Sequence, residues 1–147
     1  MSNFLTVQRN ARKLTRSKVK KDLFDFIRTL EKELEAYNRA TIYDESEDID
    51  GDPIGFYSMG TQLITGGRKS KGDPFDLKES GTFLEGIFAK VQKDSILFDT
   101  TDSKKKKVFE NLLSDDIFGL QDADLHKILD EKVEPFLIYY FKKNLLQ

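Results

Sequence analysis

Apolar residues recur at helical spacing over residues 17–38 of the chain. They fall in steps of three and four, which places them along one side of an α-helix: Val19, Leu23, Phe26, Ile27, Leu30, Leu34 and Tyr37. Ser17 precedes the run, and its hydroxyl is suited to accept a hydrogen bond from a backbone N–H at the helix start. Because three heptads barely sustain a free-standing coiled coil, the pattern predicts one long helix packed against a core.

The middle of the chain changes to alternation, which is typical of a half-buried strand. Residues 84–91 and 95–100 are two such runs, and the polar residues 92–94 between them predict a short turn, so the two runs form a β-hairpin. One face of the hairpin holds Ile87, Ala89, Val91, Ile96 and Phe98. Apolar Phe88 and Leu97 on the other face indicate that a helix or a partner covers it as well.

Helical spacing returns in the last third of the chain. Residues 104–113 predict a helix capped by Ser103, and a second helix begins at Asp122. The inward positions of this second helix are Leu125, Ile128 and Leu129. Pro135 either begins a further helix or kinks a continuous one, because it has no N–H to donate. Helical ends around a central hairpin predict one α+β domain, residues 17–147, with a β-hairpin packed by a long N-terminal helix and C-terminal helices.

Residues 40–80 have no sustained period and separate the first helix from the hairpin. They hold six of the nine glycines and two of the three prolines. A connection this long is uncommon in a compact domain and is usually functional or ordered by a partner. Its apolar patches, residues 54–59 and 62–65, are suited to form edge strands or to lie against a neighbour. We therefore expect residues 40–80 to be an interface loop.

The composition sets the size of the core. The chain has 147 residues, 38% of them hydrophobic and 34% charged, so much of it is expected at the surface. Twelve Phe and five Tyr predict a small aromatic core. The absence of cysteine excludes disulfides and thiolate metal sites and suits a reducing cytosol. With no pattern of a signal peptide or a membrane span, we expect a soluble protein that does not contact a membrane.

The net charge of −2 conceals two opposite blocks. The first lies within residues 1–21, which hold seven cations and no acid: Arg9, Arg12, Lys13, Arg16, Lys18, Lys20 and Lys21. The second lies within residues 44–52, which hold six acids: Asp44, Glu45, Glu47, Asp48, Asp50 and Asp52. Such blocks are either complementary surfaces of neighbouring copies or two solvated segments. We treat residues 1–16 as a basic N-terminal arm.

No motif predicts catalysis or a bound cofactor. His126 is expected on the surface of a helix, without a Ser or Cys partner. An EF-hand with Gly51 at loop position six would begin at Ser46 and end at Tyr57, neither of which suits its end positions. Gly66-Gly67-Arg68-Lys69-Ser70 lacks the spacing of a phosphate-binding loop. A hydrolase using the carboxylates of residues 44–52 is the weakest hypothesis, because its site would be poorly desolvated. We expect no enzyme, no metal and no cofactor.

Four short motifs resemble a family of small virion proteins from tailed bacteriophages, most closely those of phages and prophages of Bacteroides-type hosts. The motifs are residues 49–58 (IDGDPIGFYS), 72–77 (GDPFDL), 79–83 (ESGTF) and 117–120 (IFGL). More distantly, the middle of the chain is similar to tail-completion or neck proteins, in which a Thr-Gly-x-Leu or Thr-Gly-x-Phe turn leads into a strand of a curved sheet backed by helices. Ser80 stands where that family usually has threonine, and the basic arm has no counterpart.

The resemblance implies a virion structural protein of the phage neck with no active site. Such relatives form homo-oligomeric rings that join the portal to the tail around the DNA channel, so the implied partners are further copies, portal or adaptor proteins and tail proteins. The implied location is the neck or tail of the virion, and the host cytoplasm during assembly. The interface residues that we predict are Arg9, Arg12, Lys13, Arg16, Asp48, Asp50, Tyr57, Ser80, Gly81 and Phe83.

The basic block supports a second hypothesis of a different class. Several cations without intervening acids neutralise phosphates and give salt-dependent DNA affinity that does not depend on sequence. The chain would then be a small DNA-binding or packaging accessory protein that acts through its N-terminal arm together with Lys18, Lys20 and Lys21. No zinc-finger, basic-zipper or RNA-recognition motif accompanies this block.

Overall fold

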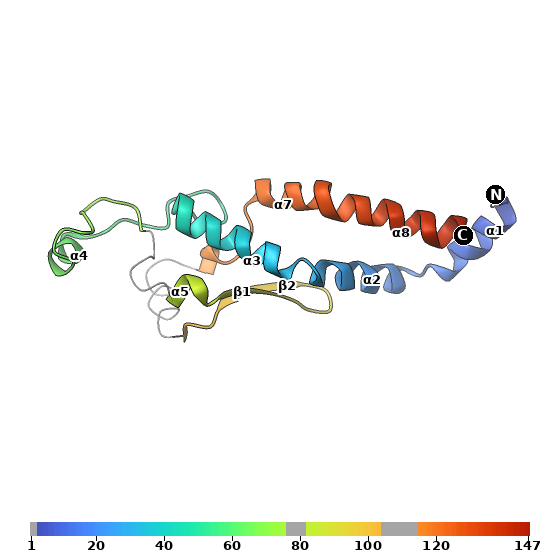
Figure 1. The fold of residues 1–147 in the computed structure, drawn as a ribbon, viewed down its shortest axis with the longest axis horizontal. Coiled ribbons are helices and arrows are strands. Elements are labelled where there is room, and N and C mark those ends of the chain that lie inside the picture. The colour runs from blue at the N-terminus through green and yellow to red at the C-terminus, as the bar shows by residue number, and fades with distance from the viewer. Residues whose placement is uncertain (1–2, 76–81, 104–114) are drawn as a thin grey trace.

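The computed structural model describes residues 3–75, 82–103 and 115–147 and shows an elongated α+β molecule (Figure 1). The two sides of its long axis are helical and antiparallel. One side consists of α2 (Arg16–Arg28) and α3 (Glu31–Ala40), and the other of α7 (Asp122–Ile128) and α8 (Glu134–Leu146). A β-hairpin packs on α3, so the predicted fold class, a hairpin packed by N-terminal and C-terminal helices, is confirmed.

The long helix predicted over residues 17–38 is divided into two. Its N-cap is Thr15 and not Ser17, because the N–H of Lys18 donates to Thr15 Oγ1 at 3.2 Å. The division lies at Thr29, whose hydroxyl donates to the carbonyl of Phe26 at 2.7 Å. The backbone N–H of Thr29 also bonds to Phe26, which tightens the last turn of α2 before α3 begins.

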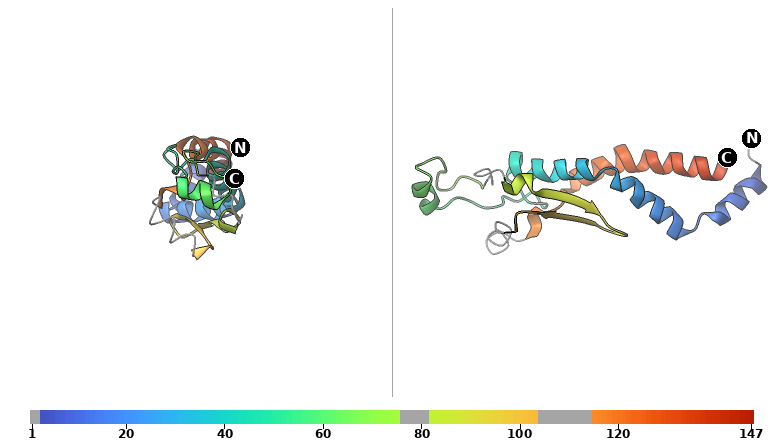
Figure 2. Two further views of the ribbon diagram at one scale, coloured as in Figure 1. Left: turned by 90° about the vertical axis from the view of Figure 1, so that its left-hand side faces the viewer. Right: turned by 60° about the horizontal axis from the view of Figure 1, so that its bottom comes forward.

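The segment predicted as a basic arm contains a helix. This helix, α1 (Phe4–Lys13), is capped by Asn3, whose side-chain oxygen accepts from the N–H of Thr6 at 2.8 Å. Asn10 donates from Nδ2 to the carbonyl of Leu145 at 3.2 Å. The bond attaches α1 to the end of α8, so the two termini lie close together (Figures 1 and 2).

The hairpin lies where the alternation predicted it, with shorter strands. Antiparallel β1 (Ile87–Val91) and β2 (Ile96–Thr100) pair in the register Ile87 to Thr100 through Val91 to Ile96. Inward residues of β1 are buried as predicted. The first residues of the predicted strand instead form a short helix, α5 (Thr82–Glu85). On the other face Phe88 is half-buried and Leu97 is 40% exposed, so the predicted cover over this face is incomplete among the described residues.

The outer helix continues from α7 through Pro135 without a break. Between α7 and α8 lies η3 (Leu129–Val133), a π-helical segment in which the N–H of Glu134 donates to the carbonyl of Leu129, five residues back. Pro135 follows in the first turn of α8, where its missing N–H is tolerated. The helix therefore packs inward through Ile128 and then Val133, a step of five. The prediction that Leu125 and Leu129 face inward is wrong, since both are exposed.

Two apolar clusters form the core. The first joins Ile42, Ile54, Phe83, Leu84, Ile87 and Ile117. The second joins Leu34, Ala89, Ile128 and Val133, and so unites α3, the hairpin and the outer helix. The prediction of an aromatic core is wrong for the described residues, because Phe83 and Tyr140 are the only aromatic residues among the buried hydrophobic ones. The rings of Phe26 and Phe136 stack at 4.2 Å between α2 and α8, where both are half-buried. The helix predicted over residues 104–113 lies outside the described residues.

The remaining described elements are short. They are η1 (Thr41–Glu45), a π-helical end to α3; α4 (Met59–Ile64), at the far end of the 40–80 loop; and η2 (Asp115–Ile117) before α7. The edge strands suggested for the loop are reduced to two isolated β-bridges, Glu47 with Pro53 and Phe56 with Pro74. Within the described part of the chain, no helix is long and apolar enough to cross a membrane.

Candidate interaction surfaces

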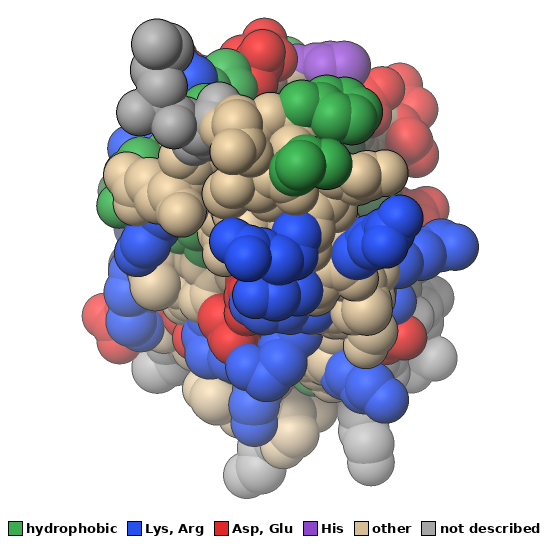
Figure 3. All heavy atoms as spheres, turned by 90° about the vertical axis from the view of Figure 1, so that its right-hand side faces the viewer, with side chains coloured by type: hydrophobic (Ala, Val, Ile, Leu, Met, Phe, Trp, Pro, Cys, Tyr) green, Lys and Arg blue, Asp and Glu red, His purple; other side chains and the backbone are tan. Residues whose placement is uncertain are grey.

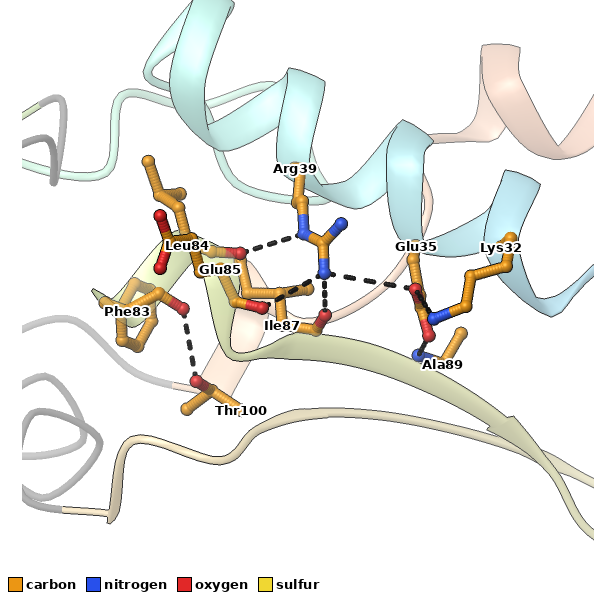
Figure 4. A network of polar contacts seen from close by, with 9 residues as sticks. All are labelled: Lys32, Glu35, Arg39, Phe83, Leu84, Glu85, Ile87, Ala89 and Thr100. Carbon is orange, nitrogen blue, oxygen red and sulfur yellow. Dashed lines mark hydrogen bonds and ion pairs between the residues drawn. The ribbon is translucent and has the colours of Figure 1, made fainter. Parts of the chain in front are cut away.

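A row of charged side chains on α3 bonds to the free edge of β1 (Figure 4). Glu31 Oε1 accepts from the N–H of Val91 at 2.8 Å, and Glu35 Oε1 accepts from the N–H of Ala89 at 3.4 Å. Arg39, the next residue at a spacing of four, donates from Nη2 to the carbonyl of Ile87 at 2.6 Å. Positions four apart lie on one side of a helix, so this row runs along the strand as a third strand would.

The Arg39 guanidinium also fixes the turn before β1. It donates from Nε to the carbonyl of Leu84 at 2.8 Å and from Nη2 to that of Glu85 at 3.2 Å. Lys32 donates to Glu35 Oε2 at 3.0 Å, and Arg39 Nη2 lies 3.9 Å from the same oxygen. Open sheet edges invite pairing with other chains, and the α3 row closes this edge within the molecule. The row belongs to the folding of the chain and not to a surface for partners.

Lysine and arginine side chains gather at the end of the molecule that carries the termini (Figure 3). Beside this end, α2 and the hairpin turn border a groove of about 900 Å³ with Phe24 in its lining. Its cations are Arg16, Lys20, Lys21, Arg28 and Lys93. Only two acids, Asp25 and Asp94, line it. They pair with three of the cations, at 2.8 Å for Lys21 and Arg28 and 3.7 Å for Lys20, which leaves the groove with a positive excess.

A buried tyrosine connects the basic helix α2 to α8. The hydroxyl of Tyr140 donates to Asp22 Oδ2 at 2.7 Å, and Lys18 donates to the same oxygen at 2.8 Å. The hydrogen bond from Lys18, and to a smaller extent that from Tyr140, holds the pKa of Asp22 below its ordinary value. Burial and then the bond to Asp22 raise the pKa of Tyr140. Lys18, predicted for DNA contact, is therefore already paired.

The acidic block forms a tight turn next to α7. Asp48 Oδ1 accepts from the N–H groups of Asp50 at 3.0 Å and Asp52 at 2.9 Å, an Asx-type turn. Gln121 donates to Glu47 Oε2 at 2.9 Å. Partial burial, followed by repulsion from Glu47 and other nearby acids, raises the pKa of Glu45. Asp48 thus shapes the turn, while Asp50 remains exposed. Among the described residues, no group of three or more acids or histidines is arranged to hold a metal ion.

Residues 55–75 extend from the domain as a stalk of two antiparallel chain segments (Figure 1). The N–H of Tyr57 donates to the carbonyl of Asp73 at 2.9 Å, and the N–H of Gly72 returns a bond to Tyr57 at 3.0 Å. The ring of Tyr57 packs edge-to-face on Phe75 at 4.8 Å. Tyr57, which we predicted as an interface residue, is half-buried and holds the two sides of the stalk together.

The tip of the stalk is the helix α4, which is capped at both ends. Ser58 Oγ accepts from the N–H of Thr61 at 3.2 Å. At the other end, Gly66 and Gly67 have φ of 62° and 82° and donate to the carbonyls of Leu63 and Gln62, which is a Schellman motif. The glycines first compared with a phosphate loop are therefore a helix C-cap. Leu63 is 74% exposed and Ile64 87%, and Phe56 and Met59 are exposed beside them.

The structure separates the predicted interface residues into different regions. Arg9, Arg12, Lys13 and Arg16 are exposed at the basic end. Phe83 is only 1% exposed and belongs to the core, where its backbone carbonyl accepts from Thr100 Oγ1 at 3.2 Å. Ser80 and Gly81 lie outside the described residues. The exposed pair on α4 lies in the apolar patch of residues 62–65, which was expected to form an edge strand or to lie against a neighbour. Its helical form was not predicted, although Ser58 and the Gly66-Gly67 pair signal a capped helix.

Comparison with known proteins adds no relative to this picture: no family model matches the sequence, and neither a curated protein nor a solved structure matches it. The resemblance of the four short motifs to small virion proteins of tailed bacteriophages therefore stays a prediction from the sequence.

Proposed function

We propose that the protein is a virion structural protein of the phage neck, a ring-forming head-to-tail connector or tail-completion protein that joins portal to tail around the DNA channel. The observation that carries the proposal is that surfaces of different character lie at separate places along one elongated subunit (Figures 1 and 3). The basic end lies beside the termini, and the acidic turn and the stalk lie toward the other end. Unlike surfaces pair head-to-tail, and head-to-tail contacts generate rings when the rotation closes.

Several features fit a subunit of such a ring. The fold closes its own β1 edge with α3, so copies need not associate through that edge. The stalk projects away from both core clusters, as a segment that reaches a neighbour would. Opposite charges on the basic groove and the acidic turn favour one orientation of neighbouring copies.

The proposal is tested by measuring mass by light scattering, for the chain alone and with the portal protein of the phage, at near-physiological salt. We expect a closed oligomer or a portal-dependent complex. Reversing two groove charges, Lys20→Glu with Lys93→Glu, should reduce the assembled mass, whereas Lys142→Glu, at an exposed position on α8, should not. A chain that remains monomeric with and without portal would overturn the proposal.

The positive groove supports a second function, non-specific DNA binding by a packaging accessory protein. Arg16, Lys20 and Lys21 from the basic block meet Lys93 of the hairpin turn in one groove, which adds a cation distant in the sequence. Binding through this groove should weaken with salt, and each lost phosphate contact should reduce the slope of log K against log salt by about 0.9. Lys20→Glu with Lys93→Glu should abolish binding at low salt, because both cations line the groove. Unchanged binding of this double variant would exclude this function.

A further inference from the structure

The tip of the stalk presents an apolar surface with a positive border. Leu63 and Ile64 lie at the end of α4 with most of their side chains exposed, and Met59, one turn earlier on the same helix, is also exposed. Arg68, Lys69 and Lys71 follow directly in the chain. Exposed apolar groups that gather at one site mark contacts with other molecules more often than scattered ones do.

The tip has a definite shape. Both ends of α4 are capped, and Gln62 Oε1 accepts from the N–H of Lys71 at 2.8 Å, which holds the returning chain against the helix. A short helix that is already formed loses less conformational entropy on binding than an unfolded segment would. The capping residues therefore maintain a helix whose apolar side chains, Leu63 and Ile64, are largely exposed.

A groove on the outer helix has the complementary character. It has a volume of about 500 Å³ and lies on η3 and α8. Its apolar lining consists of Leu129, Val133, Leu137, Ile138 and Phe141. The other two lining residues are acids, Asp130 and Glu134. The groove therefore combines an apolar floor with negative charge, whereas the border of the tip is positive. Apolar grooves on proteins accept the apolar side of a helix.

The tip and the groove of one molecule cannot meet. The helix α4 lies at one extreme of the long axis, and α8 occupies the opposite half in both views (Figures 1 and 2). We propose that α4 of one copy docks, with Leu63 and Ile64 leading, into the η3–α8 groove of a second copy. The inference rests on the proposed self-assembly and names the surfaces that make it. Because tip and groove are different surfaces, the contact repeats head-to-tail.

Cross-linking tests the contact directly, because the natural chain has no cysteine. A tagged Ile64→Cys variant is mixed with an untagged Ile138→Cys variant and treated with a short bismaleimide. We expect a dimer that contains one tagged and one untagged chain. The matched control is Tyr139→Cys, the neighbouring exposed residue on α8, which lines a different hollow beside Phe26. Equal yields from Ile138→Cys and Tyr139→Cys would overturn the inference.

A second measurement follows assembly by light scattering on dilution. Leu63→Asp places a carboxylate in the apolar floor and should weaken self-association at least tenfold. Ala36→Asp adds the same charge at an exposed position of α3 and should leave self-association within twofold. Normal assembly of Leu63→Asp would overturn the docking and leave the neck function standing. A wild-type chain that is monomeric alone would also overturn the docking, because both surfaces belong to this chain, while a portal-dependent complex would still support the neck function.

Discussion

The middle of the molecule and the tip of its stalk use their side chains in opposite ways. In the middle, Glu35 is 4% exposed and bonds to the backbone of β1, so a charged side chain is buried. At the tip, Ile64 is 87% exposed on a helix with two well-formed caps, so an apolar side chain faces solvent. Polar groups are buried where the fold completes its own hydrogen bonds, and the apolar groups exposed at the tip form the surface that we propose for docking.

The comparison implies that substitutions in the middle reduce stability and that substitutions at the tip do not. The largest effect is expected from Phe83→Ala, because the ring lies in the first core cluster with 1% exposed. The cavity and the lost burial should reduce the free energy of unfolding by about 4 kcal/mol. Urea denaturation measures it, with the exposed ring change Phe56→Ala as control. A loss below about 1.5 kcal/mol would contradict the core position of this ring.

The α3 row provides the next largest effect. Glu35→Ala leaves the N–H of Ala89 without its acceptor and removes the carboxylate beside Arg39, and should cost about 3 kcal/mol. The matched control on the same helix is Glu33→Ala, which removes a half-exposed carboxylate 3.8 Å from Lys132 and should cost less than about 1 kcal/mol. Equal losses in the two variants, again by urea denaturation, would show that the row does not hold the strand.

Lowering the pH should test the hydrogen bond between Asp22 of α2 and Tyr140 of α8. The pKa of Asp22 is below its ordinary value of 3.8 in the folded chain, so the stabilisation is present above that pH and is lost as the pH falls through the folded pKa. The expected loss is on the order of 0.5 kcal/mol, because the carboxylate is partly exposed. Unfolding below pH 4 should reveal this loss in the wild type and not in Asp22→Asn. If both proteins lose the same stability below pH 4, the loss comes from carboxylates other than Asp22.

The smallest effect on stability is expected at the tip. Leu63→Asp removes no contact with either core cluster, so the free energy of unfolding should change by less than about 0.5 kcal/mol. Thermal and urea unfolding at concentrations where the chain is monomeric measure it. A loss of unfolding free energy as large as that of Glu35→Ala would show that Leu63 stabilises the fold, and the two regions would then not differ.

The hairpin and the outer helix were predictable because their period follows from the geometry of each element. Alternation places Ile87 and Val91 on one face whatever packs on it, and both are buried. The break in the first long helix at Thr29 could not be predicted from the sequence, because the apolar stripe continues on both sides of it. Leu125 and Leu129 were placed inward on a regular helix, and the π-helical segment moves the contact face away from them.

The charged row on α3 and the exposed tip of the stalk were harder to predict from the sequence. Charges four apart on α3 are also typical of a solvated helix face, and only the position of β1 makes them internal. Phe83 belongs to one of the motifs from which the resemblance was predicted, but its ring lies in the core and not at the surface. At the tip, the sequence does signal the local structure, because Ser58 and Gly66-Gly67 are typical of the two ends of a capped helix. The exposure of Leu63 is not signalled, because it depends on the distance between the tip of the stalk and the core.

The π-helical segment η3 sets how the two ends of the outer helix are oriented about their common axis. Each residue of an α-helix turns the chain by about 100°, so the wide turn shifts the phase of everything that follows it. The acidic turn bonds to the chain just before α7, through Gln121, while the apolar groove lies on η3 and α8. Deleting one residue from η3 would therefore rotate the η3–α8 groove against the acidic turn, and in the proposed ring it would change the angle between successive copies.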